Sequence, residues 1–313
     1  MDNALTGFLR LSKLFGVFQV LKDGSLKCSP YSPFTFLAVV FSLAYTGAIL
    51  YSFIFNVLLE NHRLSYILTI LPNAILTVVA DYLIRISSIL YSSELSQFVA
   101  VTGEARWNEQ DHGFVDWFWR GLSVLFLTCC TVINVATVIG TINAGAGIGT
   151  VMASTWTMLS GFFHDGGNVC ALGFVLMSGM RIVSNYEGLC GEMLEFCRDK
   201  NASVSFTAVA NAEKHYGAVN ISACADHGQK LVDRFGQLRL AFGIFSKIGG
   251  VFILALVLDM TTWLYSLACT VLFNQYCAPS AFMFAMTVFG ALLDVLVLVA
   301  VAELGHQMKN RVI

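Results

Sequence analysis

Long stretches without a charged residue constrain the fold of this chain more than any other feature. No Asp, Glu, Lys or Arg occurs in the 32 residues between Lys27 and Glu60, or in the 44 residues between Arg120 and Asp165. About 20 apolar residues are enough to cross the hydrocarbon core of a bilayer. Over the whole chain 57% of the residues are hydrophobic and 12% are charged, about half the charged fraction of a soluble domain. The sequence therefore predicts an all-α, polytopic bundle of membrane helices.

Six membrane spans are predicted from the apolar runs and the turns between them. They lie at about 34–59, 64–91, 117–142, 158–181, 244–272 and 280–303. The glycine-rich stretch 143–149 predicts a turn after the third span. We expect 143–157 to form an apolar outer loop or a partial re-entrant segment. The first run is too long and starts too late for a signal peptide.

Lysine and arginine predict the orientation of the chain, because they are in excess on the cytoplasmic side of membrane proteins. One set of alternate segments holds fifteen of them: Arg10, Lys13, Lys22, Lys27, Arg106, Arg120, Arg181, Arg198, Lys200, Lys214, Lys230, Arg234, Arg239, Lys309 and Arg311. The opposite segments hold only Arg63. Both termini are therefore predicted to be cytoplasmic.

The domain organisation follows from the spans and their orientation. The predicted parts are a cytoplasmic N-terminal segment (1–33), spans one to four (34–184), a cytoplasmic helical connection (185–241), spans five and six (242–304) and a cytoplasmic tail (305–313). Within the connection an apolar stripe recurs at helical spacing, formed by Leu231, Phe235, Leu238 and Phe242. We expect span five to continue as a helix into the cytoplasm. The stripe would pack against the neighbouring helix or, alternatively, against another subunit.

Several classes of function fit the sequence poorly. A G-protein-coupled receptor needs its N-terminus outside, and the short connection before Pro279 cannot hold the pore helix and filter of a voltage-gated channel. No H-E-x-x-H, G-x-S-x-G or P-loop motif occurs, and Asp294 lacks the preceding glycine of an intramembrane aspartyl protease. The nine cysteines show no C-x-x-C pair, and a net charge of -2 gives no basic surface for nucleic acid. We expect no enzyme, no metal site and no cofactor.

One charged pair lies within a predicted span. Asp81 and Arg85 are four residues apart on one face of span two. An isolated charge at the centre of a membrane helix costs at least about 2.5 kcal/mol, so we expect the two to neutralise each other. A role in gating and a purely structural role both remain open.

The outer half of span five offers the predicted ligand-binding face. Asp259, Thr262 and Ser266 share one side of the helix, and Trp263 lies beside them. Such a face could bind small polar or sugar-like ligands, or it could form hydrogen bonds between helices. Further candidates for ligand contact are His164 and Asp165 near the outer end of span four, Asn73, Asn134 and Asp294. For His164 and Asp165 a solvated helix end is the alternative.

Three short segments carry a resemblance to a known family. They are 8–18 (FLRLSKLFGVF), 179–185 (GMRIVSN) and 231–238 (LVDRFGQL), the last followed by an apolar helix containing Trp263-Leu264-Tyr265. They are similar to the segment before the first span, the inner end of the fourth span and the helix entering the fifth span of the arthropod (insect-type) gustatory receptors. Together with the predicted span order and orientation, the resemblance covers nearly the whole chain.

The resemblance implies a chemosensory subunit of a tetrameric ligand-gated cation channel at the plasma membrane. Each subunit would hold a small-molecule (tastant) pocket in its helix bundle, surrounded by lipid, and would assemble as a homo- or hetero-oligomer. The family's seventh span lines the pore and carries a Thr-Tyr pair and a Gln-Phe pair, which are missing before Ile313. The alternatives are a small-molecule transporter, and a truncated, non-conducting receptor or scaffold.

Overall fold

The computed structural model describes residues 12, 14–17, 33–54, 64–104, 113–143, 145, 147–207, 217–273 and 281–311. Within these ranges all regular secondary structure is helical. The helices are α2 (Pro33–Ile54), α3 (Leu64–Leu90), α4 (Ser92–Glu104), α5 (Gly113–Asn143), α6 (Ile148–Thr207), α7 (Gly217–Phe273) and α8 (Ala281–Arg311). The predicted all-α class is confirmed over this part of the chain.

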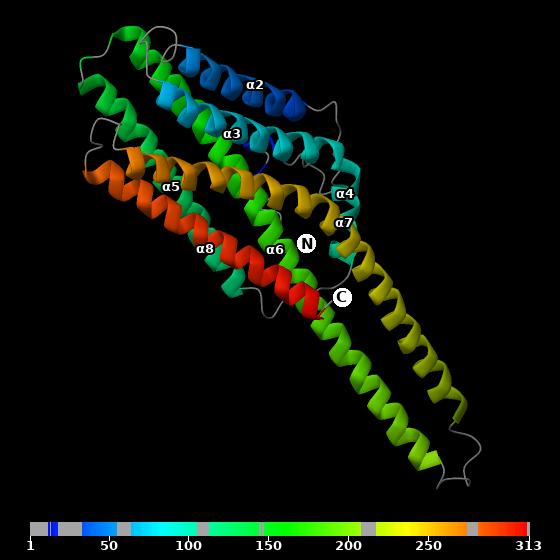
Figure 1. The fold of residues 1–313 in the computed structure, drawn as a ribbon. Helices are drawn as coiled ribbons and strands as arrows, with labels where there is room; N and C mark the ends of the chain where they lie inside the picture. The colour runs from blue at the N-terminus through cyan, green and yellow to red at the C-terminus, as the bar shows by residue number, and fades with distance from the viewer. Residues whose placement is uncertain are drawn as a thin grey trace.

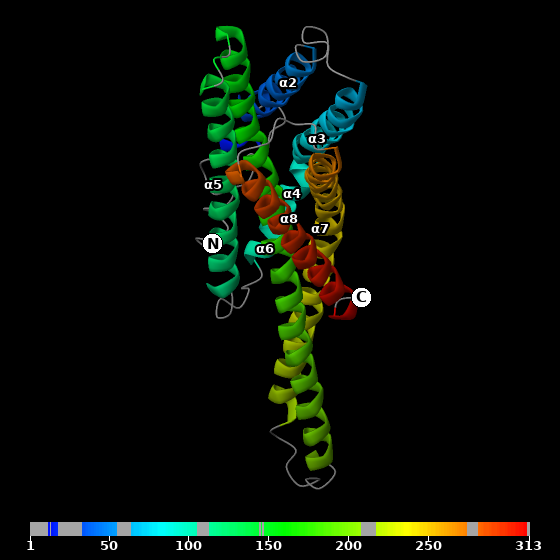
Figure 2. The same cartoon turned by 60° about the vertical axis from the view of Figure 1, so that its left-hand side comes forward.

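Helix α6 is the central element of the bundle. It packs against α2, α3, α5, α7 and α8. Figures 1 and 2 show α2 and α3 on one side of α6 and α5 on the other. Small residues on α6 let its neighbours approach closely, as small residues do between membrane helices. At Gly179, for example, an added Cβ would lie 2.5 Å from the Leu304 side chain of α8.

Among the described residues, four helices are long and apolar enough to cross a membrane. The segments are Leu71–Leu90, Ile148–Arg198, His227–Tyr265 and Val288–Asn310, and shorter apolar segments occur at Phe36–Tyr51 and Leu127–Asn143. Large apolar side chains on the outer helices face away from the bundle: Phe36, Leu296 and Val299 are 70%, 61% and 60% exposed. Apolar side chains outside and charged side chains inside are typical of a protein surrounded by lipid. The chain is therefore an all-helical bundle of the membrane type.

The turn between α5 and α6 lies within the predicted glycine-rich stretch, and Gly145 adopts φ +70° there. The predicted loop or re-entrant segment at 143–157 is wrong, however, because α6 already begins at Ile148. The hydroxyls of Thr155 and Thr157 donate to backbone carbonyls four residues earlier in the same helix. Polar side chains that bond back in this way do not interrupt a helix.

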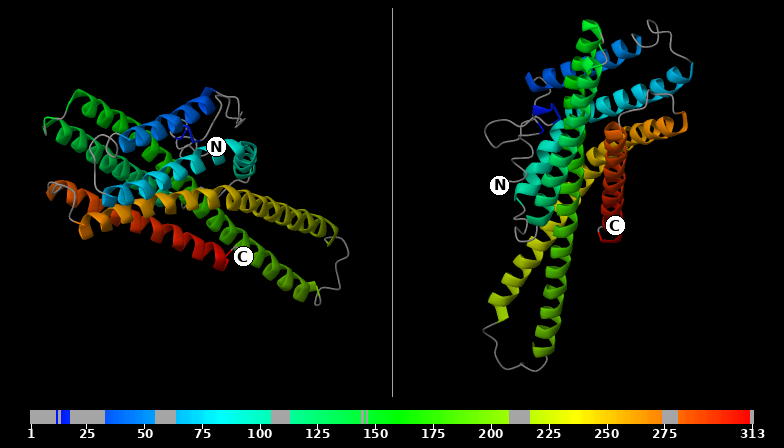
Figure 3. Two further views of the ribbon diagram at one scale, coloured as in Figure 1. Left: turned by 45° about the horizontal axis from the view of Figure 1, so that its top comes forward. Right: turned by 90° about the vertical axis from the view of Figure 1, so that its left-hand side faces the viewer.

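Helices α6 and α7 extend together beyond the rest of the bundle (Figure 3). The predicted continuation of span five as a helix is present, since α7 is one helix from Gly217 to Phe273. Its apolar stripe packs against α6: Leu231 and Leu238 are buried, and the Phe235 ring lies 6.1 Å from the Tyr186 ring. The pair Arg234–Glu192 also joins the two helices, but it is half exposed and contributes little to stability.

Candidate functional site

The predicted pair Asp81–Arg85 forms inside the bundle. The Arg85 Nε donates to Asp81 Oδ1 over 2.9 Å, and both residues are 2% exposed. The other guanidinium nitrogens donate to two backbone carbonyls, that of Phe15 before α2 and that of Phe163 on α6, the latter over 2.9 Å. The hydroxyl of Ser42 on α2 donates to Asp81 Oδ2 over 2.5 Å. The pair therefore connects α3 with α2, α6 and the segment before α2.

His164 of α6 joins this pair to α7. Its Nδ1 lies 3.2 Å from Asp81 Oδ1, and its Nε2 lies 3.1 Å from Asp259 Oδ1. The Asn168 amide donates to the other oxygen of Asp259 over 2.6 Å. The Tyr45 ring of α2 stacks on the imidazole, with 4.6 Å between ring centres and 5° between planes. The histidine thus links two carboxylates that belong to different helices.

The hydrogen-bond partners assign the protonation of His164. An ionised carboxylate only accepts hydrogen bonds, so each ring nitrogen that faces one donates, and the ring carries both hydrogens. Asn168 Nδ2 lies 3.1 Å from His164 Nε2 as well as 2.6 Å from Asp259 Oδ2. Because an amide NH2 can only donate, its hydrogen bond goes to the closer and charged acceptor, Asp259, and His164 Nε2 donates to the other oxygen of the same carboxylate. The imidazolium and the Arg85 guanidinium balance the charges of Asp81 and Asp259. Buried charges persist in proteins when they are paired in this way. We call these four ionisable residues, with Asn168, the buried polar network.

Gly166 of α6 leaves room for the segment before α2, whereas a side chain at Gly167 would make only an ordinary contact with Arg85. At Gly166 an added Cβ would lie 2.0 Å from the Phe15 ring, and at Gly167 it would lie 3.5 Å from Arg85 Nη2. On the same helix His164 and Asn168 are four residues apart, so both side chains lie on one face. Helix α6 therefore leaves room for the segment before α2 at Gly166. Its His164 side chain contacts Asp81 of α3 and Asp259 of α7.

Gly16 fixes the Phe15 carbonyl that Arg85 uses. Its φ is +68°, and an added Cβ would lie 2.9 Å from the Ala38 backbone. We expect Gly16→Ala to lower the free energy of unfolding by about 1–3 kcal/mol, because both the conformation and the contact become strained. Gly47→Ala on α2 is the matched control, since nothing lies within 4 Å of its added Cβ. In thermal melts of the detergent-solubilised protein the control should be neutral or stabilising, and an equal loss in both variants would contradict this role of Gly16.

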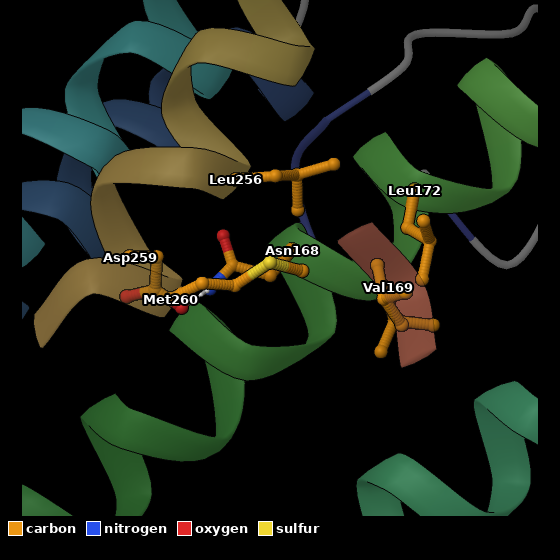
Figure 4. A pocket seen from close by; sticks show the side chains of 7 residues that line it. Asn168, Val169, Leu172, Leu256, Asp259 and Met260 are labelled. Carbon is orange, nitrogen blue, oxygen red and sulfur yellow. Dashed lines mark hydrogen bonds between the residues drawn. The ribbon is translucent and has the colours of Figure 1, made fainter. Parts of the chain in front are cut away.

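A cavity lies beside the network, between α6, α7 and α8 (Figure 4). Its lining residues are Asn168, Val169, Leu172, Leu256, Asp259, Met260 and Val297. Its volume is about 20 Å³, enough for one water molecule or one hydroxyl group. The cavity is therefore small, mostly apolar and polar at one wall.

The structure brings together only some of the predicted ligand contacts. Asp259 lines the cavity, whereas the Thr262 hydroxyl donates to the Asp259 carbonyl in its own helix over 2.6 Å. The partly buried Trp263 is not a lining residue. The side chains of Ser266 and Asp294 lie outside the described part of the structure. Of the described side chains on the predicted face of α7, Asp259 lines this cavity.

The remaining predicted contacts have different surroundings. His164 and Asp165 are 4% and 8% exposed, so the alternative of a solvated helix end is wrong. Asn134 of α5 lies against Gly161, one turn before His164 on α6. Asn73 precedes Asp81 by eight residues, which is about 12 Å along α3. Of these four residues only His164 belongs to the buried polar network.

Ser42, Tyr45 and Asn168 belong to the site but were not predicted from the sequence. The four-residue spacing of His164 and Asn168 was a usable signal, because it puts a second hydrogen-bonding side chain on the same face of the helix. Ser42 and Tyr45 are three residues apart on α2 and could have been paired in the same way. Nothing in the local sequence, however, indicates that α2 approaches α3 and α6 at this point.

Comparisons with known proteins leave the site to be interpreted from its own geometry. Among the described residues no group of three or more His, Cys, Asp or Glu side chains is placed to hold a metal ion. The chain matches no protein-family model, and it shows no significant similarity to a curated protein.

Proposed function

We propose that this chain is a chemosensory subunit of a ligand-gated cation channel that detects small molecules at the plasma membrane. One observation carries the proposal: the bridge from Asp81 through His164 to Asp259 joins three helices beside a cavity. Ionisable residues inside a membrane bundle are functional candidates, because burying them is costly. A ligand in the cavity would contact the same Asp259 and Asn168 that hold the bridge together.

The long helices supply a route from the ligand to the far end of the molecule. From His164 to Thr207 α6 is unbroken, a length of about 65 Å at 1.5 Å per residue. Asp259 likewise lies in a helix that continues back to Gly217. A ligand that favours one arrangement of the bridge would bias the position of both helices. This coupling supports a receptor, and the resemblance to gustatory receptors supports a tetrameric channel.

The proposed topology has six spans and places both termini and the extension of α6 and α7 in the cytoplasm. The extension contains two glycosylation sequons, beginning at Asn201 and Asn220. We expect neither to carry a glycan when the chain is expressed in animal cells, since glycosylation occurs on the outer side. Gel mobility before and after glycosidase treatment measures this. A sequon introduced at the turn around Gly145 is the positive control, and glycan on Asn201 or Asn220 would overturn the orientation.

The channel activity is tested by whole-cell recording from cells that express the chain, alone or with a second channel subunit. A panel of small molecules should evoke a cation current that is absent from mock-transfected cells and is lost when sodium is replaced by an impermeant organic cation. Surface labelling verifies delivery to the plasma membrane. Absence of current in all combinations, with the protein at the surface, would contradict the channel proposal.

A small-molecule transporter is the second candidate, and the same bridge favours it. A chain of carboxylate, imidazole and carboxylate inside a membrane can pass a proton, as in proton-coupled transporters. Purified protein in liposomes with an internal pH dye discriminates between the two functions. A transporter would couple proton entry to substrate uptake, whereas the proposed channel would conduct cations without stoichiometric proton movement.

A further inference from the structure

We propose that the segment before α2 is a reversible latch, which holds α2 against α6 when it is closed, as in this structure, and frees α2 to move when it opens. The latch consists of Ser12 and residues 14–17, and its Ser12, Phe15 and Val17 are at most 5% exposed. The inference goes beyond the proposed function, because it concerns the segment before α2 and not the ligand. Its test needs no current.

The Phe15 ring of the latch packs on α6 where a glycine leaves room for it. An added Cβ at Gly166 would lie 2.0 Å from the ring, so any side chain at this position would displace the latch. The rings of Phe162 and Phe163 lie 5.7 Å and 6.5 Å from the Phe15 ring, measured between ring centres. One aromatic side chain therefore supplies most of the apolar contact between the latch and α6.

The backbone of the latch makes a polar contact with the buried polar network. The amides of Phe15 and Val17 donate to the Ser12 carbonyl over 3.2 Å and 3.1 Å, and Gly16 adopts φ +68°. A glycine in this conformation ends a helical turn, and the last carbonyls of such a turn need partners from elsewhere. The Phe15 carbonyl accepts a hydrogen bond from Arg85. The closed latch thus contacts α3 as well as α6.

The latch supports the first turns of α2 at two points. The Gly16 backbone lies directly against Ala38, where an added Cβ would come within 2.9 Å, and Ala38 is fully buried. The Phe163 ring, which packs on Phe15, also stacks on the Phe41 ring of α2 with 4.0 Å between ring centres. Opening of the latch removes the first contact and takes away one side of the Phe163 ring.

The next turn of α2 contacts the buried polar network. The Ser42 hydroxyl donates to Asp81, and the Tyr45 ring stacks on His164. Both residues lie on the same helix as Ala38, within two turns of it. A shift of α2 after opening would therefore move two groups that contact the bridge.

The latch can open without leaving a buried charge unpaired. The Arg85 Nε also donates to both oxygens of Asp81, and its Nη2 donates to the Phe163 carbonyl, so these contacts do not involve the latch. Loss of a neutral carbonyl costs a paired guanidinium less than loss of its carboxylate. The latch is also covered on one side only, since Leu14 is 65% exposed. Opening is therefore a local event, distinct from unfolding of the bundle.

The test is hydrogen–deuterium exchange of the full chain in lipid nanodiscs, measured by mass spectrometry. The amides of Phe15 and Val17 should exchange at least about a hundredfold faster than those of the α6 core at 169–176, because local opening costs less than global unfolding. Phe15→Ala should speed exchange of the latch at least about tenfold and leave 169–176 unchanged, since it removes the main apolar contact. Leu14→Ala, at the exposed position of the same segment, is the matched control and should exchange like the parent.

A disulfide between positions 15 and 166 holds the latch closed. An added Cβ at Gly166 would lie 2.6 Å from Phe15 Cγ, which is one bond from the Phe15 Cβ. Cysteines at the two positions are therefore within disulfide reach, which is about 3.5–4.5 Å between Cβ atoms. Cys170→Ala, made in all proteins of this comparison, removes the buried thiol one turn away. Oxidation of the Phe15→Cys, Gly166→Cys protein should slow exchange of the latch at least about tenfold relative to its reduced form.

The movement of α2 is measured by pulsed electron paramagnetic resonance, in a chain whose native cysteines are replaced. Spin labels at Phe36 of α2 and Leu194 of α6 use positions that are 70% and 72% exposed. Phe15→Ala should shift the mean distance between them by about 2 Å or more, as helix shifts in switching proteins do. Leu14→Ala should leave the distance unchanged.

Each measurement has an outcome that overturns the proposal. Latch amides that exchange only together with the α6 core would make the segment a permanent anchor, and equal exchange of the latch in Phe15→Ala and the parent would also reject the latch. An unchanged distance between α2 and α6 in a variant whose latch is open would reject the hold on α2. If Phe15→Ala fails to fold, the rates of the parent and of the reduced and oxidised cysteine pair still decide.

Discussion

Replacing Asp81 with alanine is expected to lower the free energy of unfolding by about 3–5 kcal/mol, because removing one partner leaves the others buried and charged. Arg85 and His164 both contact the Asp81 carboxylate, and all three residues are at most 4% exposed. The measurement is the fraction of monodisperse protein after heating in detergent. Asp233→Ala on the exposed part of α7 is the control and should change stability by less than about 0.5 kcal/mol.

The Asp81–Arg85 pair can be isolated by a double-mutant cycle. Arg85→Ala alone should also be strongly destabilising, and the double variant should recover part of the combined loss. Recovery should be incomplete, since His164 still lacks its second carboxylate in the double variant. Losses that simply add would show that the two residues are not coupled.

Asp259→Asn is expected to raise the ligand concentration for half-maximal current about tenfold, or 1.4 kcal/mol. The substitution keeps the shape of the side chain but replaces one acceptor with a donor. His164 and Asn168 both donate to this group, so one of the two contacts is lost. Surface labelling is measured alongside and the current is compared at equal surface density, because the loss of the Asp259 charge also leaves the buried His164 imidazolium with one counter-charge fewer.

Two controls belong to this experiment. Asp233→Asn makes the same chemical change on the same helix but away from the cavity, and it should respond like the parent. Thr262→Val should also have a small effect, since the Thr262 hydroxyl is already bonded to the backbone of its own helix. A strong effect of Thr262→Val with a normal response of Asp259→Asn would place the ligand site elsewhere on α7.

Local features of the site could be predicted from the sequence, because they depend on spacing within one helix. The pairing of Asp81 with Arg85 needs only a four-residue separation on α3, and it is present in the structure. The packing of the Leu231 and Leu238 stripe likewise follows from helical periodicity. Both features depend on the helical repeat and on the cost of unpaired charge or exposed apolar surface.

The bridge could not be predicted in this way, because its members come from distant parts of the chain. His164 contacts one partner 83 residues before it and another 95 residues after it. A single sequence specifies which residues share a helix face, but not which helices are adjacent or how far one is shifted along another. Burial was misjudged for the same reason: His164 lies near the middle of the bundle, although the sequence suggested a helix end.

Solid-state NMR of the full chain in lipid, with labelled histidine and aspartate, tests the central claim most directly. The His164 bridge predicts that both ring nitrogens are protonated and that each shows a through-space correlation to a different carboxyl carbon, one from Asp81 and one from Asp259. Assignment uses Asp81→Asn and Asp259→Asn, each of which should remove one correlation. A ring nitrogen of His164 without a hydrogen, or correlations that survive both substitutions, would contradict the account.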